Sequence, residues 1–181
     1  VTTIPVWRTR SRVVNPLLDF GAVYESVAQP LVAWPRGFPI NMVRDPTTFR
    51  MDGSVALPPV LPSRVGVLQG LADHDPDVDA IYRMTRHTPF RFSHTPRAVA
   101  MPRGALSPYN AQATLIRAEA LWSAFLPTTV HGRVSDIWRS YIAQRLMWDV
   151  GLFLAFSEPL VTQFRNAHNY LGDFNAEQHL Y

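Results

Sequence analysis

Residues 130–151, with the sequence VHGRVSDIWRSYIAQRLMWDVG, hold the most distinctive candidate for chemistry in this chain. Asp136 stands where a loop turns into an amphipathic helix, which we expect at residues 135–150. With Ser135 as the N-cap, Asp136 would occupy the first helical position, where the helix dipole favours a carboxylate by about 0.3–1 kcal/mol. A carboxylate fixed beside a pocket can also act as a general base that takes a proton from a hydroxyl group. The sequence leaves both interpretations open.

The same helix carries an apolar pattern. Large apolar residues recur at every fourth position, namely Trp138, Ile142, Leu146 and Val150. This spacing predicts a stripe buried against the core, although Trp138 could instead stack on a sugar ring. Arg145 falls inside the stripe, and an ion pair with Asp149 one turn later is the economical way to satisfy it. A phosphate-facing Arg145 is the alternative.

The tripeptide Pro-Arg-Gly occurs twice, at residues 35–37 and 102–104. Glycine permits a tight turn, and arginine can contact an anion with two hydrogen bonds. The first copy is more typical of a structural turn. The second leads into a polar loop, so we take Arg103, Asn110 and Gln112 as candidates for substrate binding. Asn110 and Gln112 could equally satisfy the backbone of the loop.

The acidic run DHDPDVD at residues 73–79 invites a metal-site interpretation, which the spacing does not support. A calcium loop needs a glycine and a later glutamate at fixed positions, and neither is present. We expect Asp75 or Asp77 to cap a helix that begins near Pro76. Both aspartates remain candidates for substrate contact.

The composition excludes several functional classes. The chain of 181 residues has no Cys, which rules out disulfides and thiol catalysis. Its 17 basic residues are all Arg, but they are scattered, so we expect no nucleic-acid partner. Its six His residues show no paired zinc spacing. No apolar run is long enough to span a membrane. The length suits one domain, and the Val1 start suggests an internal or C-terminal piece of a longer protein.

Strand-like and helix-like segments alternate along the chain. We expect strands at residues 65–71, 111–117, 152–157 and 161–165, and a strand followed by a loop at residues 98–110. We expect a loop that runs into a helix at residues 73–86, and helices at residues 118–127 and 135–150. The polar tail, residues 166–181, should wrap over the surface. This alternation predicts an α/β fold with a mixed sheet flanked by helices.

Several segments together resemble the STELLO-like (DUF288) family of glycosyltransferases. The matching text includes QGLADHDPDVDAIYRMTR, AMPRGALSPYNAQATL, RVSDIWRSYIAQRLMWDVG and RNAHNYLGDF. A weaker similarity, through MPRG and DIW, leads to the plant reversibly glycosylated polypeptides. Ala111 and Ala113 depart from the family pattern, because relatives tend to carry polar residues in that loop.

The resemblance implies the C-terminal, acceptor-side part of a GT-A-like nucleotide-sugar transferase. Asp136 would then be the general base of an inverting enzyme, or a ligand of the donor sugar or acceptor in a retaining one. Arg103, Asn110 and Gln112 would line the donor-sugar pocket. His168, or Gln163 or Arg165 in its place, would lie near the diphosphate or its metal. The metal, Mn²⁺ or Mg²⁺, would be held mostly by an upstream half. The family further implies a Golgi location, a glycan acceptor, and a membrane anchor only upstream of this segment.

A second function from another class fits the same resemblance. The chain could be a non-catalytic scaffold that assists the assembly or trafficking of polysaccharide synthases, with protein partners or as a homo-oligomer. Partner binding predicts an exposed aromatic patch from Trp7, Trp34, Trp122 or the C-terminal tyrosines. Catalysis predicts a concave polar pocket at Asp136. A polysaccharide-binding domain would need aromatic side chains aligned on a flat face.

Overall fold

The computed structural model describes the chain apart from residues 1, 21, 25–31, 49–56, 87–88 and 95–96. The strands are β1 (Val23–Tyr24), β2 (Val65–His74), β3 (Phe90–Arg91), β4 (Ala98–Ala100), β5 (Thr114–Ile116) and β6 (Phe153–Gln163). The α-helices are α1 (Pro16–Asp19), α2 (Ala80–Thr85), α3 (Gly132–Asp149) and α4 (Tyr170–Glu177). No helix in the described ranges combines the length and the apolar character that crossing a membrane requires.

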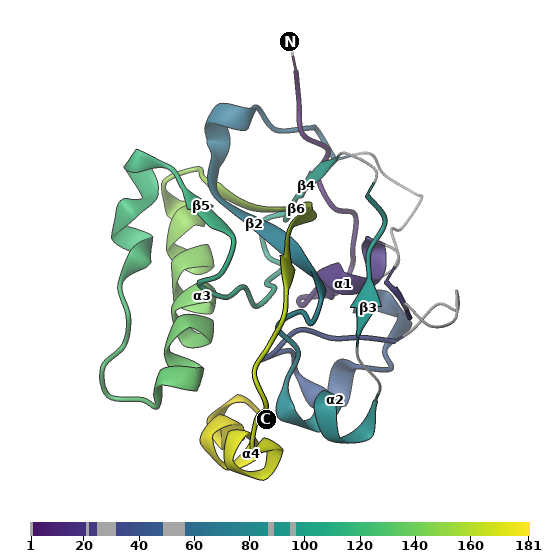
Figure 1. Cartoon of the computed structure of the whole chain (residues 1–181). Coiled ribbons are helices and arrows are strands. Elements are labelled where there is room, and N and C mark those ends of the chain that lie inside the picture. Colours follow the sequence, from purple (N-terminus) through teal and green to yellow (C-terminus); the bar gives the residue numbers. More distant parts are fainter. Residues whose placement is uncertain (1, 21, 25–31, 49–56, 87–88, 95–96) are drawn as a thin grey trace.

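The two long strands β2 and β6 run parallel at the centre of a mixed sheet (Figure 1). The expected strand at residues 65–71 is confirmed as β2, which continues to His74. Gln69 to Asp73 are buried consecutively, so β2 is covered on both faces, as is usual for a central parallel strand. Strand β4 pairs antiparallel with β6, while β3 and β5 pair antiparallel with β2. The prediction of an α/β fold with a mixed sheet is confirmed.

Strand β6 corrects the expectation of two separate strands at residues 152–157 and 161–165. It is one strand that pairs with β2 along its length, from Val65↔Phe153 to His74↔Gln163. Register shifts near Gly70 and Leu71 accommodate the irregularity around Pro159. The resulting platform is therefore longer than the sequence pattern predicted.

Helix α3 lies beside the sheet with the opposite face inward from the one that we expected. The four residues of the apolar stripe are exposed: Trp138 by 43%, Ile142 by 42%, Leu146 by 45% and Val150 by 55%. The prediction of a buried stripe was wrong. The buried face instead carries Val134, Ser135, Ile137, Arg139, Ser140, Ala143, Gln144 and Met147. The expected ion pair between Arg145 and Asp149 is confirmed at 2.7 Å, but it lies on the surface.

Both helix starts differ from the sequence prediction. Helix α3 begins at Gly132 with His131 as its N-cap, so Asp136 is its fifth residue rather than its first. The side chain of Ser135 caps nothing and donates to the Pro127 carbonyl. Helix α2 is capped by Asp79, whose carboxylate accepts from the Tyr82 N–H at 2.7 Å. Asp79 is thus the helix-capping residue of the acidic run.

Three further segments refine the sequence pattern. The expected strand at residues 111–117 is confirmed only as the short β5, and the expected helix at 118–127 is a 3₁₀ helix, Ala118–Ala124. The tail lies on the surface as expected, and it also contains helix α4. Trp7 and Trp34 are core residues, so only Trp122 of the three named tryptophans is exposed.

Candidate active site

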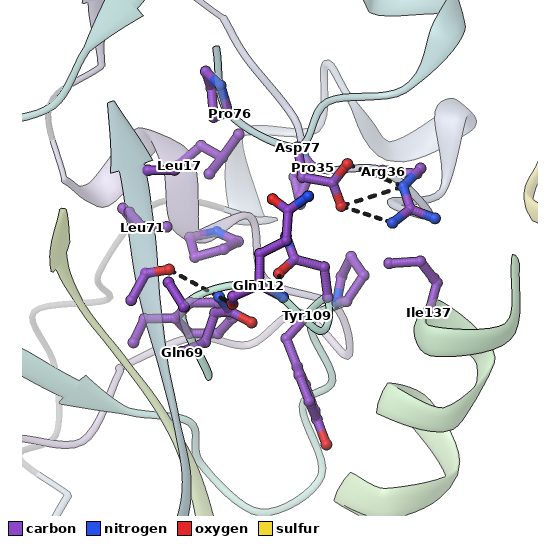
Figure 2. A pocket seen from close by; sticks show the side chains of 17 residues that line it. Leu17, Pro35, Arg36, Gln69, Leu71, Pro76, Asp77, Tyr109, Gln112 and Ile137 are labelled. Carbon is purple, nitrogen blue, oxygen red and sulfur yellow. Dashed lines mark hydrogen bonds and ion pairs between the residues drawn. The ribbon is translucent and has the colours of Figure 1, made fainter. Parts of the chain in front are cut away.

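An arginine between two aspartates lies at the centre of the candidate site. Arg36 is only 7% exposed, and its guanidinium donates to Asp77 from Nε (3.1 Å) and Nη2 (2.9 Å). The same group donates to Asp136 from Nη1 (3.2 Å) and Nη2 (3.1 Å). Nη1 also donates to the Arg133 carbonyl. Figure 2 shows the contact between Arg36 and Asp77 at one side of a pocket. All the donor nitrogens of Arg36 are therefore engaged.

The charges of this group stabilise one another. Burial alone would raise the pKa of Asp77, but the adjacent guanidinium of Arg36 holds that pKa below its usual value. Burial would likewise lower the pKa of Arg36, and the two carboxylates raise it instead. Arg36 and Asp77 are consequently both charged at neutral pH, and each stabilises the charge of the other.

The first Pro-Arg-Gly copy positions Arg36. Gly37 has a φ of +81°, which favours glycine, and a Cβ at that position would overlap the side chain of Ile137 in α3. The hydroxyl of Tyr141 donates to the Gly37 carbonyl at 2.8 Å, and the Arg36 N–H donates to the Asp77 carbonyl at 2.9 Å. The turn is thus pressed between α3 and the segment that follows β2.

Two further arginines extend the ion network from Asp77. Arg165, just beyond β6, lies 3.3 Å from Asp77 and 3.8 Å from Asp75. Arg83 of α2 pairs with Asp75 at 2.5 Å. Burial is the main reason that the pKa of Arg165 is lowered, and the neighbouring carboxylates offset part of that shift. The segment between β2 and α2 is therefore held by alternating charges.

Helix α3 holds the loop at residues 107–113 with the polar residues of its inner face. The Gln144 side chain accepts from the Ser107 N–H (3.0 Å) and donates to the Ser107 carbonyl (2.7 Å). Arg139 donates to the Asn110 carbonyl at 3.3 Å, and Asp136 accepts from the Ala111 N–H at 3.1 Å. Buried polar groups need such partners, which is why this face of α3 turns inward.

Gln69 holds the far end of the loop from strand β2. Its amide nitrogen donates to the Gln112 carbonyl at 2.7 Å, and its oxygen accepts from the Thr114 hydroxyl at 3.1 Å. Ala113 next to it has a φ of +41°, an uncommon conformation for a residue with a side chain. Its carbonyl accepts from the Gly70 N–H at 2.9 Å, which holds the residue there. The strained position lies at the cavity described next.

A small cavity of about 40 Å³ lies between the Arg36 turn, strand β2 and the loop. Its lining includes Arg36, Asp77, Gln69, Asn110 and Gln112. This volume holds a few water molecules and is too small for a sugar ring. The buried Oε1 of Gln112 has no hydrogen-bond partner among the described residues, so it offers an acceptor to a water or a ligand hydroxyl. Asp136 does not line the cavity but adjoins it through Arg36 and Ala111.

The contacts of Asp136 leave room for one further donor. A carboxylate has about four acceptor positions on its two oxygens. Among the described residues, Oδ2 accepts from Arg36 and Ala111, whereas Oδ1 accepts from Arg36 alone. The side chain of Asp136 is 13% exposed, so it is reachable from solvent. The remaining position on Oδ1 suits a hydroxyl group.

The structure brings together four of the residues that the sequence singled out: Asp77, Asn110, Gln112 and Asp136. Asp75 lies at the edge of the same ion network. Arg103 lies apart, because it lines a second pocket with none of these residues. Trp138 is half-exposed on the outer face of α3 and does not line the cavity. Roles in substrate binding remain predictions for all of these residues.

The described residues do not by themselves form a metal site. They contain no group of three or more potential His, Cys, Asp or Glu ligands. His168, the weak metal candidate, has its Nδ1 3.2 Å from the Asp173 carboxylate. Asp73 accepts from the Phe92 N–H (2.9 Å) and lies 2.5 Å from His94 Nε2.

Sequence reasoning missed three members of the site. Arg36 was assigned to a structural turn, although the Pro-Arg-Gly motif signalled a possible anion contact. Gln69 could have been noticed as a polar residue within an otherwise apolar strand. Arg165 was considered only as an alternative to His168, and its contact with Asp77 follows from the pairing of β6 with β2.

Comparisons with known proteins bear on this geometry. Residues 133–181, which include Asp136, match the family of STELLO glycosyltransferases. "Probable glycosyltransferase STELLO2" of Arabidopsis thaliana is 34% identical over 175 residues, which are 93% of this chain and 21% of that protein. "Probable glycosyltransferase STELLO1" of the same plant is 33% identical over 164 residues, 87% of this chain and 20% of that protein.

The similarity therefore extends over most of this chain, which spans about one fifth of the length of these two relatives. It confirms the resemblance that the segments around Asp77 and Asp136 indicated. Over most of its length, the chain is thus similar to STELLO glycosyltransferases.

Proposed function

We propose that this chain forms the acceptor-side part of a GT-A-like glycosyltransferase, which transfers a sugar from a nucleotide-sugar to a hydroxyl acceptor. The observation that carries the proposal is the placement of Asp136. It is held by Arg36 and the Ala111 N–H beside a polar cavity at the carboxyl-terminal half of β2. Ligands of open α/β sheets commonly bind near the carboxyl ends of the strands.

In this proposal, the acceptor hydroxyl donates to the remaining position on Asp136 Oδ1. The hydroxyl oxygen forms a bond to the anomeric carbon, and the bond from that carbon to the phosphate oxygen breaks. The nucleoside diphosphate leaves with the electron pair. In an inverting reaction Asp136 accepts the hydroxyl proton, whereas in a retaining reaction it only orients a sugar hydroxyl. The anomeric configuration of the product distinguishes the two.

The surrounding residues have separate roles in this proposal. Arg36 fixes the orientation of the Asp136 carboxylate, and Asn110 and Gln112 offer hydrogen bonds to sugar hydroxyls at the cavity mouth. Because the cavity is smaller than a sugar ring, the sugar lies across its mouth. The nucleotide and its divalent metal bind mainly to parts of the intact protein outside the described residues. We further propose, from the family resemblance, that the intact protein acts in the Golgi.

The experiment compares the full-length wild-type protein with Asp136→Asn. Binding of UDP- and GDP-sugars is measured by calorimetry with Mn²⁺, and sugar transfer is measured as product formed. We expect donor binding in both proteins and a loss of about 10²-fold or more in turnover in the variant, as for other positioned acid–base groups. Absence of donor binding by well-folded wild-type protein would contradict the proposal.

The matched control is Asp149→Asn on the same helix. Asp149 is exposed and, among the described residues, pairs with Arg145 alone. Its substitution therefore removes one negative charge, as Asp136→Asn does, without altering the site. It should leave turnover within a factor of about two, because a surface ion pair contributes little. Equal losses of turnover in both variants would show that removing a negative charge from the helix is enough to lower turnover, and that Asp136 has no role of its own in the reaction.

A second candidate function, a non-catalytic interaction module, is favoured by the outer face of α3. Here the apolar stripe and the neighbouring 3₁₀ helix expose two tryptophans, Trp122 (40%) and Trp138 (43%). The charges on this face, Arg145 and Asp149, neutralise each other, which suits an apolar protein surface better than an anionic membrane. Light scattering over a concentration series, with a Trp138→Ser/Leu146→Ser variant, tests whether this face mediates assembly. An assembly unaffected by both substitutions would exclude it.

A further inference from the structure

A second pocket lies away from the Asp136 site. It has a volume of about 630 Å³, within the range of small-molecule sites. Phe153, at the start of β6, belongs to its lining, whereas the first cavity adjoins the later part of β2. The two pockets share no lining residue.

Two chain segments that separate and rejoin form this pocket. The N-terminal segment runs parallel to the segment that starts at the end of β4. The two form isolated β-bridges at Val6↔Ala100 and at Val13↔Leu106. Between the bridges, residues 9–12 form one wall and residues 102–104 form the opposite wall. Gly104 supports the second wall through a turn with φ of +87°, and open space surrounds the position that a Cβ would occupy. The hollow between the bridges is thus a product of the fold.

Hydrogen bonds hold the first wall in place. The Thr9 hydroxyl donates to the Thr47 carbonyl at 3.1 Å and accepts from the Ser11 N–H at 2.9 Å. The Ser11 hydroxyl accepts from the Val13 N–H at 3.2 Å. These bonds shape the segment that carries Arg12, so the wall is preorganised for a ligand.

The floor of the pocket is apolar and continuous with packed side chains. Val6 is buried in a small cluster with Ala100 and Ala155, and Val60 and Phe153 pack against that cluster. Pro102 and Ala105 are buried as well and complete the apolar lining. Such a floor suits an alkyl, prenyl or ring substituent and offers it few hydrogen bonds.

The rim of the pocket is basic. Arg10 and Arg12 lie on one wall and Arg103 on the other, and no Asp or Glu occurs among the described lining residues. The side chains of Arg12 and Arg103 are exposed, and neither makes a hydrogen bond or ion pair with another described residue. Elsewhere Arg36, Arg83, Arg133 and Arg165 are all paired with carboxylates. Two guanidinium groups on the two wall segments, without a carboxylate partner among the described residues, suit a dianionic group.

We propose that this pocket binds a phosphate ester with an apolar substituent, its phosphate or diphosphate between Arg12 and Arg103 and its apolar part on the floor formed by Val6, Val60 and Phe153. The proposal does not depend on glycosyl transfer, because the pocket is separate from Asp136. The same chemistry is offered by a soluble ester and by the headgroup of an anionic lipid.

Calorimetry with octyl phosphate on the full-length protein tests this proposal, with methyl phosphate as the probe that lacks the apolar part. We expect saturable binding of octyl phosphate that is at least about tenfold tighter than that of methyl phosphate, because only octyl phosphate covers the floor. Arg12→Gln and Arg103→Gln should each weaken binding about tenfold or more, because each removes charge-assisted hydrogen bonds. Arg44→Gln, which removes an exposed arginine outside the pocket, should leave binding unchanged.

The proposal is overturned if the folded wild-type protein shows no saturable binding of octyl phosphate. It is also overturned if the Arg12→Gln/Arg103→Gln double variant, shown by circular dichroism to melt like the wild type, binds as tightly as the wild type. Sedimentation with phosphatidylcholine vesicles, with and without phosphatidic acid, distinguishes the source of the ligand. Pelleting that requires phosphatidic acid and both arginines identifies a lipid headgroup. Binding of octyl phosphate without such pelleting identifies a soluble ester.

Discussion

Arg36 and Asp136 form a two-bond ion pair across a separation of one hundred residues, with Nη1–Oδ1 at 3.2 Å and Nη2–Oδ2 at 3.1 Å. The pair joins the turn at residues 35–37 to helix α3. Since Arg36 also binds Asp77, one side chain fixes both carboxylates that border the candidate site. The orientation of Asp136 is therefore set by a contact between distant parts of the chain.

Replacing Arg36 tests how much stability this group provides. Arg36→Gln leaves the side chain of Asp136, 13% exposed, without its arginine partner, and leaves Asp77, 7% exposed, with only the longer contact to Arg165 among the described residues. We expect a loss of about 3–5 kcal/mol in the free energy of unfolding, as for other broken buried ion pairs. Urea unfolding measures it. Arg145→Gln, whose pair with Asp149 is exposed, should cost at most about 0.5 kcal/mol, and a similar loss in both variants would contradict this account.

Asp79 makes stability depend on pH near neutrality. Burial raises its pKa to about 6 and the Glu177 carboxylate adds to the shift, although hydrogen bonds from Tyr82 and Trp34 oppose it. A carboxyl whose pKa is raised on folding stabilises the fold at low pH. That contribution, about 3 kcal/mol for a shift of this size, is fully present below about pH 3.8 and lost as the pH rises through about 6.

Urea unfolding between pH 4 and 7.5 measures the difference between the wild type and Asp79→Asn. Asn retains an acceptor for the Tyr82 N–H but does not titrate, so the variant should gain stability relative to the wild type as the pH rises. Other titrating groups contribute equally to the stability of both proteins, so their effects cancel in the difference. Asp77 is one of them: its pKa is lowered, so its stabilising contribution is lost as the pH falls. Parallel stability curves for the two proteins would show that Asp79 does not titrate in this range.

Two glycines with similar backbone conformations allow the cost of backbone strain to be distinguished from the cost of steric overlap. Gly37 (φ +81°) and Gly104 (φ +87°) both favour glycine, but only a Cβ at Gly37 would overlap Ile137. We expect Gly104→Ala to cost about 1–2 kcal/mol from backbone strain alone. Gly37→Ala should cost more than that, because α3 must also move. Thermal melting of both variants measures the difference in stability. Equal losses of stability would mean that α3 can move away from the turn without an energetic cost.

Neighbouring residues of α3 test which face is buried. Met147 is fully buried, whereas Leu146 is 45% exposed on the outer face. Met147→Ala should therefore cost about 2–5 kcal/mol through the cavity it leaves. Leu146→Ala should cost less than about 1 kcal/mol, because a surface residue loses few contacts. Urea unfolding of the two variants gives both values. If Leu146→Ala cost more than Met147→Ala, the apolar stripe of α3 would be buried, as the sequence pattern predicted.

The sequence by itself determined the features that depend on neighbouring residues. The mostly apolar run at residues 65–71 predicted strand β2, because a strand covered on both faces is rich in apolar residues. The spacing of Arg145 and Asp149 predicted their ion pair, because residues four apart meet on a helix. The junction before α3 and the acidic run supplied Asp136 and Asp77, two of the carboxylates of the site.

Only the tertiary structure decided which face of α3 is buried and which arginine belongs to the site. Periodicity favours burial of Leu146, but Gln144 and Arg139 turn inward, where they hydrogen-bond the backbone of Ser107 and Asn110 in the loop at residues 107–113. The two Pro-Arg-Gly copies look alike in sequence. The first meets two carboxylates from distant segments, and the second meets none among the described residues, so Arg36 is buried in an ion network and Arg103 lies at the rim of an open pocket. Charge pairing over such separations follows from the packing of β2, β6 and α3, which no local pattern records.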